Sequence, residues 1–304
     1  MRIVFMGTPD FAVASLRALC AAGHEIAAVV TKPDMPKNRG MKLMPSPVKK
    51  AALELGLPVY TPERIKSAET AELLASFGAD VFAVVAFGRL LPKHILDMPR
   101  LGCVNVHGSL LPKYRGSAPV QWTVLNGEKT AGVTTMLLDE GMDTGAMLLS
   151  ESVEVGEYES FGSLYARLAD VGAELLVRTL AGLEDGSVVP TPQDEALASY
   201  APPVTKGMCP VDWEKSAVDI INKIRGLDPA PAANADIAGV RFKLFGARPT
   251  GRRSGLPAGS VAGTDKQGIE VVCGGGETLV ITELQAPGGK RMKAADYLRG
   301  HPLA

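Results

Sequence analysis

Short apolar runs alternate with segments of helical spacing along the first part of the chain. Residues 2–6 (RIVFM) and 25–31 (EIAAVVT) are rich in β-branched and other apolar side chains. Between them, the apolar positions of residues 9–23 recur at helical spacing and end at Gly23. A strand, a helix and a strand in this order form a βαβ unit with parallel strands and a right-handed crossover. The pattern therefore predicts a parallel sheet.

The alternation continues beyond this unit. Helices are expected at residues 46–56, 67–78 and 159–186, and Ser67 is placed to cap the second of them. Further strands are expected at residues 57–60, 80–88, 102–110, 130–139 and 146–155. The predicted fold class is α/β, with an open, Rossmann-like, mostly parallel sheet and helices on both faces. In such sheets, ligands bind beyond the carboxyl ends of the strands.

The pattern changes after residue 186. Residues 187–212 are rich in proline, which indicates a linker that wraps from one domain to the next. A helix is expected at residues 214–226, and the short strands that follow it, separated by Gly and Pro turns, predict a small antiparallel β-barrel. A last helix is expected at residues 293–300. We therefore expect a domain at residues 1–186, a linker at 187–212 and a second domain at 213–304.

The composition is typical of a globular protein of two domains. The chain has 304 residues, of which 46% are hydrophobic and 21% charged, and single cores typically contain ~100–200 residues. No apolar run reaches the ~18 residues of a membrane helix. Gly7 and Pro9 interrupt the first apolar run too early for a secretory signal. We therefore expect a cytoplasmic protein and exclude the membrane and secreted classes.

The charges and the cysteines limit the ligands to be considered. The chain has a net charge of −1, but residues 206–304 contain 14 Lys and Arg against 10 Asp and Glu, which is +4 and leaves −5 for the rest. A basic C-terminal part suits a polyanionic partner, although such an excess is also common on a solvated face. The cysteines form no CxxC pair, so we expect neither a disulfide nor a zinc site. They are Cys20, Cys103, Cys209 and Cys273.

Two segments near the expected carboxyl edge of the sheet have two interpretations each. Residues 5–11 (FMGTPDF) hold a single glycine where a dinucleotide site requires three, which argues against NAD. This stretch is either a helix start with proline in its first turn or the border of a substrate pocket. Residues 31–47 form a long loop, which is either a solvated surface or a basic arm that grips a phosphate-bearing substrate. Its basic residues are Lys32, Lys37, Arg39 and Lys42.

Polar side chains occupy alternate positions of the strand expected at residues 102–110. Asn105, His107 and Ser109 therefore share one face near its carboxyl end. An asparagine amide can donate to a developing oxyanion, and a histidine can exchange a proton near neutral pH. A lone histidine is more often a core residue with satisfied hydrogen bonds, but Asn105 and His107 together favour chemistry. No GxSxG motif surrounds Ser109, which makes it a poor nucleophile.

Asp143 lies in the turn expected between the strands at residues 130–139 and 146–155. A turn aspartate commonly accepts hydrogen bonds from its own turn in an Asx-turn. If Asp143 faces His107 instead, it orients the imidazole and favours the charged form of the ring. Asn105, His107 and Asp143 without a nucleophile indicate direct acyl transfer through a tetrahedral intermediate.

These residues lie in segments that resemble the formyltransferases that use 10-formyltetrahydrofolate. The resemblance rests on residues 105–119 and 142–145, which read NVHGSLLPKYRGSAP and MDTG. It extends to residues 5–12, 39–49 and 84–92, which read FMGTPDFA, RGMKLMPSPVK and VVAFGRLLP. It covers essentially the whole chain. Within the family, the chain resembles the members that act on methionyl-tRNA.

The resemblance implies transfer of a formyl group from 10-formyltetrahydrofolate to the free α-amino group of methionine on initiator tRNA, without a metal. It implies that Asn105, His107 and Asp143 are catalytic, and that Asn105 and protonated His107 stabilise the oxyanion. Folate-binding residues are expected in two loops, namely Phe87, Gly88, Leu90, Ser109, Leu110, Leu111 and Pro112. Contacts with tRNA are expected from an OB-like C-terminal barrel and from Lys37, Arg39, Lys42 and Lys206. We expect a monomer.

One segment departs from the family, and three alternatives stay open. Many relatives carry an aromatic-rich NPWP-type segment after the helix at residues 214–226, whereas residues 227–239 read LDPAPAANADIAG without Trp. The first alternative is a folate-dependent formyltransferase that acts on a small amine, such as a glycinamide ribonucleotide or a nucleotide amino sugar. The others are a nucleic-acid-binding module without activity and a dinucleotide oxidoreductase. The basic segment at residues 32–49 and the basic C-terminal part favour tRNA.

Overall fold

The structure, a computed structural model, describes residues 1–37 and 42–302. It divides the chain into two compact units. The first unit consists of Met1–Pro119, Ala131–Val153 and Tyr165–Pro202. The second unit consists of Val120–Thr130, Glu154–Leu164 and Pro203–Ala304.

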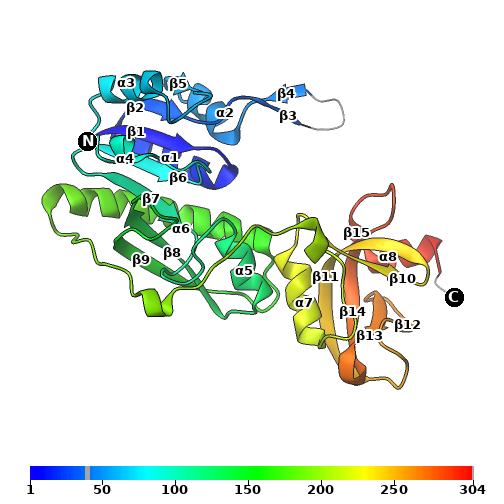
Figure 1. Ribbon diagram of the computed structural model, residues 1–304. Coiled ribbons are helices and arrows are strands. Elements are labelled where there is room, and N and C mark those ends of the chain that lie inside the picture. Colours follow the sequence, from blue (N-terminus) through cyan, green and yellow to red (C-terminus); the bar gives the residue numbers. More distant parts are fainter. Residues whose placement is uncertain (38–41, 303–304) are drawn as a thin grey trace. The chain divides into compact units, whose positions relative to one another are not determined.

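The first unit is built on a seven-stranded sheet with the order β5-β2-β1-β6-β7-β8-β9 (Figure 1). Its strands are β1 (Arg2–Gly7), β2 (Glu25–Val30), β5 (Val59–Tyr60), β6 (Val81–Val85), β7 (Cys103–His107), β8 (Thr130–Leu137) and β9 (Met147–Glu154). Every pair from β5 to β7 is parallel, and β8 is antiparallel to β7. The expected mostly parallel sheet is confirmed. The carboxyl ends of β1, β2, β6 and β7 consequently lie at one edge.

Helices cover both faces of this sheet. They are α1 (Asp10–Ala21), α2 (Pro47–Glu54), α3 (Ala68–Ser76), α4 (Lys93–Leu96) and most of α6 (Phe161–Asp185). Leu74 of α3 and Ile95 of α4 share a buried core with Cys103 of β7. On the other face of β7, Gly172 of α6 lies against Val106. In the part of the chain that the structure describes, no helix is long and apolar enough to span a membrane.

Local interactions fix several boundaries of these elements. The Ser67 Oγ atom accepts a hydrogen bond of 3.2 Å from the Thr70 N–H, so Ser67 caps α3 as expected. The strand expected at residues 102–110 ends at His107, where the chain turns into a loop that Thr134 holds. Ser109 therefore lies beyond the strand. The expectation of three alternating polar residues on one strand is wrong for Ser109.

Residues 31–47, expected as a long loop, contain a β-hairpin of β3 (Met35–Lys37) and β4 (Lys42–Met44). Met35 pairs with Met44 and Lys37 with Lys42. Figure 1 shows the hairpin extending away from the seven-stranded sheet. The apolar residues Met35 and Leu43 are 58% and 67% exposed, so these two strands lack the buried apolar positions by which the sequence pattern marks a strand.

Residues 187–202, expected as the first part of a linker, belong to the first unit. Thr191 and Met147 exchange two backbone hydrogen bonds of 2.8 Å. Farther along, the Arg115 N–H donates to the Ser199 carbonyl (2.8 Å), and the Ala201 N–H donates to the Arg115 carbonyl (2.7 Å). Proline removes only its own backbone donor, so its neighbours can still pair. We call residues 191–201 the strap.

The second unit is built on an antiparallel sheet with the order β10-β11-β14-β13-β12, and β15 pairs with β14. Its strands are β10 (Ala233–Ile237), β11 (Val240–Arg253), β12 (Val261–Thr264), β13 (Ile269–Val272), β14 (Glu277–Gln285) and β15 (Met292–Lys293). Helix α7 (Ala217–Gly226) packs Ile220 and Ile224 into its core, and α8 (Ala294–Gly300) follows β15. The expected antiparallel architecture is confirmed. Across residues 203–302, no strand pairing joins β10 to β12, so the hydrogen-bonded path is open.

Two short segments that the sequence pattern groups with residues 1–186 lie in the second unit. One of them contains most of α5 (Pro119–Leu125). The other, Glu154–Leu164, is tied to α7, because the Arg225 guanidinium donates to the carbonyl oxygens of Gly156 (3.4 Å) and Glu159 (3.3 Å). These contacts join residues far apart in the sequence, which the local pattern does not encode.

Candidate active site

Strand β7 carries Asn105 and His107 to the carboxyl edge of the sheet on one face. On this face Cys103, two residues earlier, is buried in the core formed with α3 and α4. Val84 of β6 lies beside Asn105, and Thr134 of β8 lies beside His107. Asn105 is half-buried, whereas His107 is 5% exposed. The strand thus passes from an apolar core to a polar site within two residues.

Both ring nitrogens of His107 face acceptors. Nε2 lies 2.9 Å from the carbonyl oxygen of Tyr114, and Nδ1 lies 3.6 Å from Oδ2 of Asp143. A carbonyl oxygen can only accept, so Nε2 carries a hydrogen and fixes the ring. Nδ1 is therefore the ring nitrogen that faces the Asp143 carboxylate, at a distance longer than a hydrogen bond.

Asp143 lies in the turn between β8 and β9, in a left-handed conformation with a φ of 57°. This conformation is uncommon outside glycine and is best tolerated by asparagine and aspartate. Its Oδ2 atom accepts a hydrogen bond of 2.8 Å from the Gly116 N–H, and the side chain is 16% exposed. The carboxylate therefore connects the β8–β9 turn with the loop after β7, beyond any role in its own turn.

The Asn105 amide and the Ser109 hydroxyl differ in their availability to a ligand. Within residues 1–37 and 42–302, no hydrogen bond engages the side chain of Asn105. The Ser109 Oγ atom, in contrast, donates to the Lys113 carbonyl at 2.6 Å, and Ser109 is 2% exposed. The amide of Asn105 can therefore donate to a bound oxygen, whereas the hydroxyl of Ser109 is committed to its own loop.

The loop after β7 is held by Thr134 and by the strap. The Thr134 Oγ1 atom donates to the Ser109 carbonyl (2.8 Å) and accepts from the Leu111 N–H (3.1 Å). The Tyr114 N–H donates to the Ser199 Oγ atom at 2.9 Å. Because Tyr114 supplies the carbonyl that orients His107, Ser199 acts on the site from 85 residues away in the sequence. Tyr114 and Ser199 were not among the residues expected from the sequence, and no local signal marks them.

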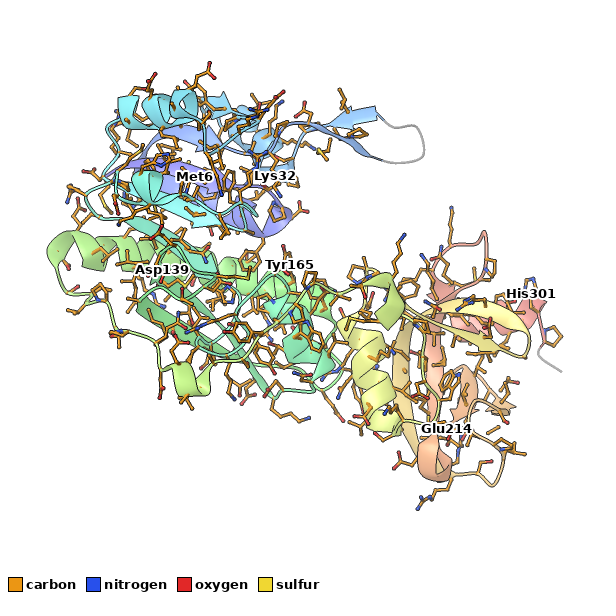
Figure 2. The ribbon with its side chains drawn as sticks, viewed as in Figure 1. Met6, Lys32, Asp139, Tyr165, Glu214 and His301 are labelled. Carbon is orange, nitrogen blue, oxygen red and sulfur yellow. The ribbon has the colours of Figure 1, made fainter. Side chains whose placement is uncertain are left out.

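The turn after β6 lies at the same edge of the sheet. Ala86 (φ 46°) and Gly88 (φ 68°) both have positive φ, and Phe87 between them is buried. The Thr8 Oγ1 atom donates to the Phe87 carbonyl at 3.3 Å, which links the end of β1 to this turn. A Cβ at Gly88 would lie 2.8 Å from the Nζ atom of Lys32, which follows β2 and is labelled in Figure 2. The ends of three strands thus meet beside an ammonium group.

The expected folate-binding residues lie in two loops that leave neighbouring strands. Phe87, Gly88 and Leu90 follow β6, and Ser109, Leu110, Leu111 and Pro112 follow β7. Leu90 is 56% exposed although it is apolar. Leu110 packs on Gly132 of β8, where any larger residue would clash with it.

The expected tRNA-binding residues belong to two different segments of the chain. Arg39 lies outside the described residues. Lys37 and Lys42 are backbone partners in the hairpin of the first unit. Lys206 is exposed in a 3₁₀ turn (Lys206–Met208) of the second unit.

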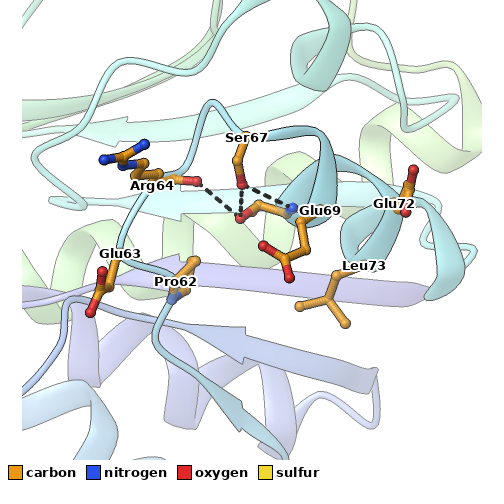
Figure 3. A pocket seen from close by; sticks show the side chains of 8 residues that line it. Pro62, Glu63, Arg64, Ser67, Glu69, Glu72 and Leu73 are labelled. Atoms are coloured by element: carbon orange, nitrogen blue, oxygen red, sulfur yellow. Dashed lines mark hydrogen bonds between the residues drawn. The ribbon is translucent and has the colours of Figure 1, made fainter.

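A separate surface groove lies at the start of α3 (Figure 3). It is lined by Pro62, Glu63, Arg64, Ser67, Glu69, Thr70, Glu72 and Leu73. Its hydroxyl groups are engaged in capping the helix, since the Ser67 Oγ atom donates to Thr70 Oγ1 (3.0 Å) and Thr70 Oγ1 donates to the Arg64 carbonyl (3.0 Å). None of the candidate catalytic or binding residues lines this groove.

Comparison with known proteins identifies relatives over the whole chain. The formyl transferase family model matches residues 1–180, and the formyl transferase C-terminal domain matches residues 203–302. The methionyl-tRNA formyltransferase of Trichlorobacter lovleyi is 48% identical over 303 residues, which cover 100% of this chain and 95% of the relative. The methionyl-tRNA formyltransferase of Pelotomaculum thermopropionicum is 47% identical over 304 residues, which cover 100% of this chain and 96% of the relative.

Solved structures share the fold at lower identity. HypX from Aquifex aeolicus in complex with tetrahydrofolic acid is 20% identical, with a TM-score of 0.65 over 98% of this chain and 47% of that chain. The N-formyltransferase from Helicobacter canadensis in complex with folinic acid and dTDP-3-aminofucose is 19% identical. Its TM-score is 0.68 over 92% of this chain and 98% of that chain. At these identities the likeness concerns the fold.

Proposed function

The chain belongs to the formyl transferase family, and from this premise we propose that it transfers a formyl group from 10-formyltetrahydrofolate to the α-amino group of methionine on initiator tRNA. Relatives that are 47% and 48% identical over nearly their full length are named for this reaction. The observation that carries the proposal is the position of His107 between the Tyr114 carbonyl and the Asp143 carboxylate, two residues along β7 from Asn105. These groups suit the stabilisation of charge at a carbonyl, and no nucleophile is among them.

The chemistry is a direct transfer. The neutral α-amine attacks the formyl carbon, a new C–N bond forms, and the formyl oxygen gains negative charge in the tetrahedral intermediate. The Asn105 amide and the Nδ1–H of His107 donate to this oxygen. Nδ1 is the nitrogen left for this role, because Nε2 is bonded to Tyr114 while the 3.6 Å to Asp143 exceeds a hydrogen-bond distance.

Asp143 has two roles in this scheme. Its carboxylate faces Nδ1 of His107 at 3.6 Å and holds the ring in place. It also accepts the proton that the amine loses on attack, directly or through a water molecule. As the bond between the formyl carbon and N10 of the folate breaks, N10 takes up this proton, and tetrahydrofolate leaves neutral at that nitrogen.

Two loops bind the folate in this proposal. The turn with Phe87, Gly88 and Leu90 offers backbone groups to the pterin ring, and the absence of a side chain at position 88 leaves room beside Lys32. Ser109, Leu110, Leu111 and Pro112 form the facing wall. Ser109 contributes the shape of the loop rather than a hydroxyl contact, because its hydroxyl is bonded to the Lys113 carbonyl.

Basic residues bind the tRNA in this proposal. Lys37, Arg39 and Lys42 belong to residues 31–47, and Lys206 belongs to the C-terminal part with its charge of +4. Residues 1–186 carry out the chemistry, residues 187–212 connect, and residues 213–304, an OB-like domain, contact the tRNA. The protein acts as a monomer in the cytoplasm, where translation is initiated.

The test supplies the protein with 10-formyltetrahydrofolate and two acceptors in parallel. One acceptor is initiator tRNA charged with methionine, and the other is a nucleotide-linked amino sugar. We expect formyl-methionyl-tRNA as the product and no formylation of the sugar. Formylation of the sugar alone would contradict the proposal and favour the small-amine alternative.

A further inference from the structure

One side chain of the strap holds the backbone of the β8–β9 turn. We propose that Gln193 is a positioning residue that fixes Asp143 against His107, an inference that rests on the proposed function. The Gln193 Nε2 atom donates hydrogen bonds of 2.8 Å to the carbonyl oxygens of Asp143 and Gly145. Its Oε1 atom accepts from Nε (3.0 Å) and Nη2 (2.8 Å) of Arg115. Both ends of one amide are therefore used to connect two loops of the site.

The orientation of the Gln193 amide follows from its partners. The Arg115 guanidinium has only donors, and backbone carbonyls only accept. The amide oxygen must therefore face Arg115, and the amide nitrogen must face the β8–β9 turn. A carboxylate at position 193 would keep the first contact and lose both donors of the second. Gln193→Glu can therefore remove the contacts with the β8–β9 turn while it keeps the contact with Arg115.

Arg115 anchors this arrangement in the protein. Its side chain is fully buried (0% exposed), and the Glu195 carboxylate accepts from Nη1 (2.9 Å) and Nη2 (2.7 Å). A buried guanidinium without acceptors is strongly unfavourable, so Arg115 keeps Gln193 and Glu195 in place. In the described part of the chain, the Glu195 carboxylate has hydrogen bonds with Arg115 and with no group of the β8–β9 turn.

Asp143 is consequently held from two sides. Gly116, which follows Arg115, donates to its carboxylate at 2.8 Å, and Gln193 holds its carbonyl at 2.8 Å. A non-glycine residue with a φ of 57° persists only when its surroundings fix it. Without the donors of Gln193, the turn can relax toward a commoner conformation and withdraw the carboxylate from Nδ1 of His107.

The test compares Gln193→Glu with Glu195→Gln in the formylation of methionyl-tRNA. Q193E keeps an acceptor for Arg115 and removes both donors to the turn. We expect its kcat to fall by at least about tenfold while KM for both substrates changes less than about threefold, because the transition state and not binding is affected. E195Q is the matched control, since it keeps an acceptor for Arg115 and leaves Gln193 intact. Its kcat should stay within about twofold of the wild-type value, because the Glu195 side chain is 70% exposed and water can replace the lost acceptor at Arg115.

Hydrogen–deuterium exchange gives a second readout that does not depend on activity. The amides of residues 139–146 should exchange faster in Q193E than in the wild-type protein, and those of E195Q should not change. Wild-type kcat in Q193E, an equal loss in E195Q, or unchanged exchange in the turn would each overturn the proposal. If Q193E does not fold, Gln193→Asn replaces it, and wild-type kcat in this shorter amide would overturn the proposal as well.

The two proposals fail in different ways. A wild-type protein that does not formylate methionyl-tRNA contradicts the proposed function, while the exchange measurement still decides whether Gln193 holds the turn. An active wild-type protein with an equally active Q193E contradicts only the role of Gln193.

Discussion

The Nδ1 atom of His107 lies 3.6 Å from the Oδ2 atom of Asp143, while Nε2 of the same ring donates to the Tyr114 carbonyl at 2.9 Å. One nitrogen is thus fixed by the backbone, and the other faces a charge at a distance that leaves its hydrogen available. Nε2 therefore orients the ring, and Nδ1 is the nitrogen that can take part in the reaction.

Asp143→Asn should separate the charge of this residue from its shape. The asparagine can still accept the Gly116 N–H, but it places no charge beside Nδ1 of His107 and cannot take up the proton of the amine. We expect kcat to fall by ~10²–10⁴, the range typical of a lost general acid or base. Single-turnover formylation at saturating folate measures this loss. More than a tenth of the wild-type rate in D143N would contradict the assigned role.

Asn105→Ala should affect activity and leave stability unchanged. The amide of Asn105 has no hydrogen bond with the described residues, so its removal leaves no donor or acceptor of the fold unpaired. We expect kcat to fall by ~10²–10³, as for the loss of one oxyanion donor, and the free energy of unfolding to change by less than about 0.5 kcal/mol. Asn105→Asp is the matched control, because it keeps the size without the N–H and should be equally inactive. A fully active N105D would exclude donation by this amide.

Ser109→Ala should lower the stability of the protein more than its activity. The Ser109 hydroxyl donates to the Lys113 carbonyl at 2.6 Å inside its loop, so its loss should destabilise the protein by about 1 kcal/mol. The rate should fall on the order of threefold, because no step of the transfer uses this hydroxyl. Urea denaturation and the formylation assay measure the two effects. A loss of activity as large as that of N105A would make Ser109 a catalytic group and contradict its structural assignment.

The parts of the site that lie within one strand or one turn could be predicted from the sequence. Side chains alternate along a strand, so the spacing of Asn105 and His107 places them on one face, and the turn that carries Asp143 is set by the two apolar runs around it. The parallel sheet was predictable for the same reason, because each βαβ unit is encoded locally.

The parts of the site that join distant segments could not be predicted in this way. Gln193 reaches Arg115 across 78 residues and lies in a proline-rich stretch that has the composition of a linker. Its role depends on the burial of Arg115, which composition and periodicity do not report. The hairpin of residues 35–44 was missed for a related reason, since Met35 and Leu43 are exposed and give no alternation of buried and solvated positions.

The stability of the first unit should depend on pH through Asp80. A hydrogen bond from the Arg2 backbone N–H to Oδ2 (2.8 Å), joined by one from the Arg100 Nε–H to Oδ1 (2.8 Å), holds the pKa of this carboxyl below its ordinary value. A carboxyl with a lowered pKa in the folded state stabilises the fold above its unfolded pKa of about 3.9, and this contribution is lost as the pH falls through the folded value.

Asp80→Asn cannot accept at both positions, so at pH 7 its free energy of unfolding should fall by about 0.5–1 kcal/mol, a range reduced by solvent screening at this partly open site. Urea denaturation should show that the difference in free energy of unfolding from wild type is constant between about pH 7 and pH 5 and shrinks below about pH 4.

The control is Asp97→Asn, which removes an exposed ion pair with Lys93. Its free energy of unfolding should differ little from the wild-type value at any of these pH values. A D80N deficit that stays the same down to pH 3 would show that packing rather than the charge of Asp80 stabilises this corner of the sheet.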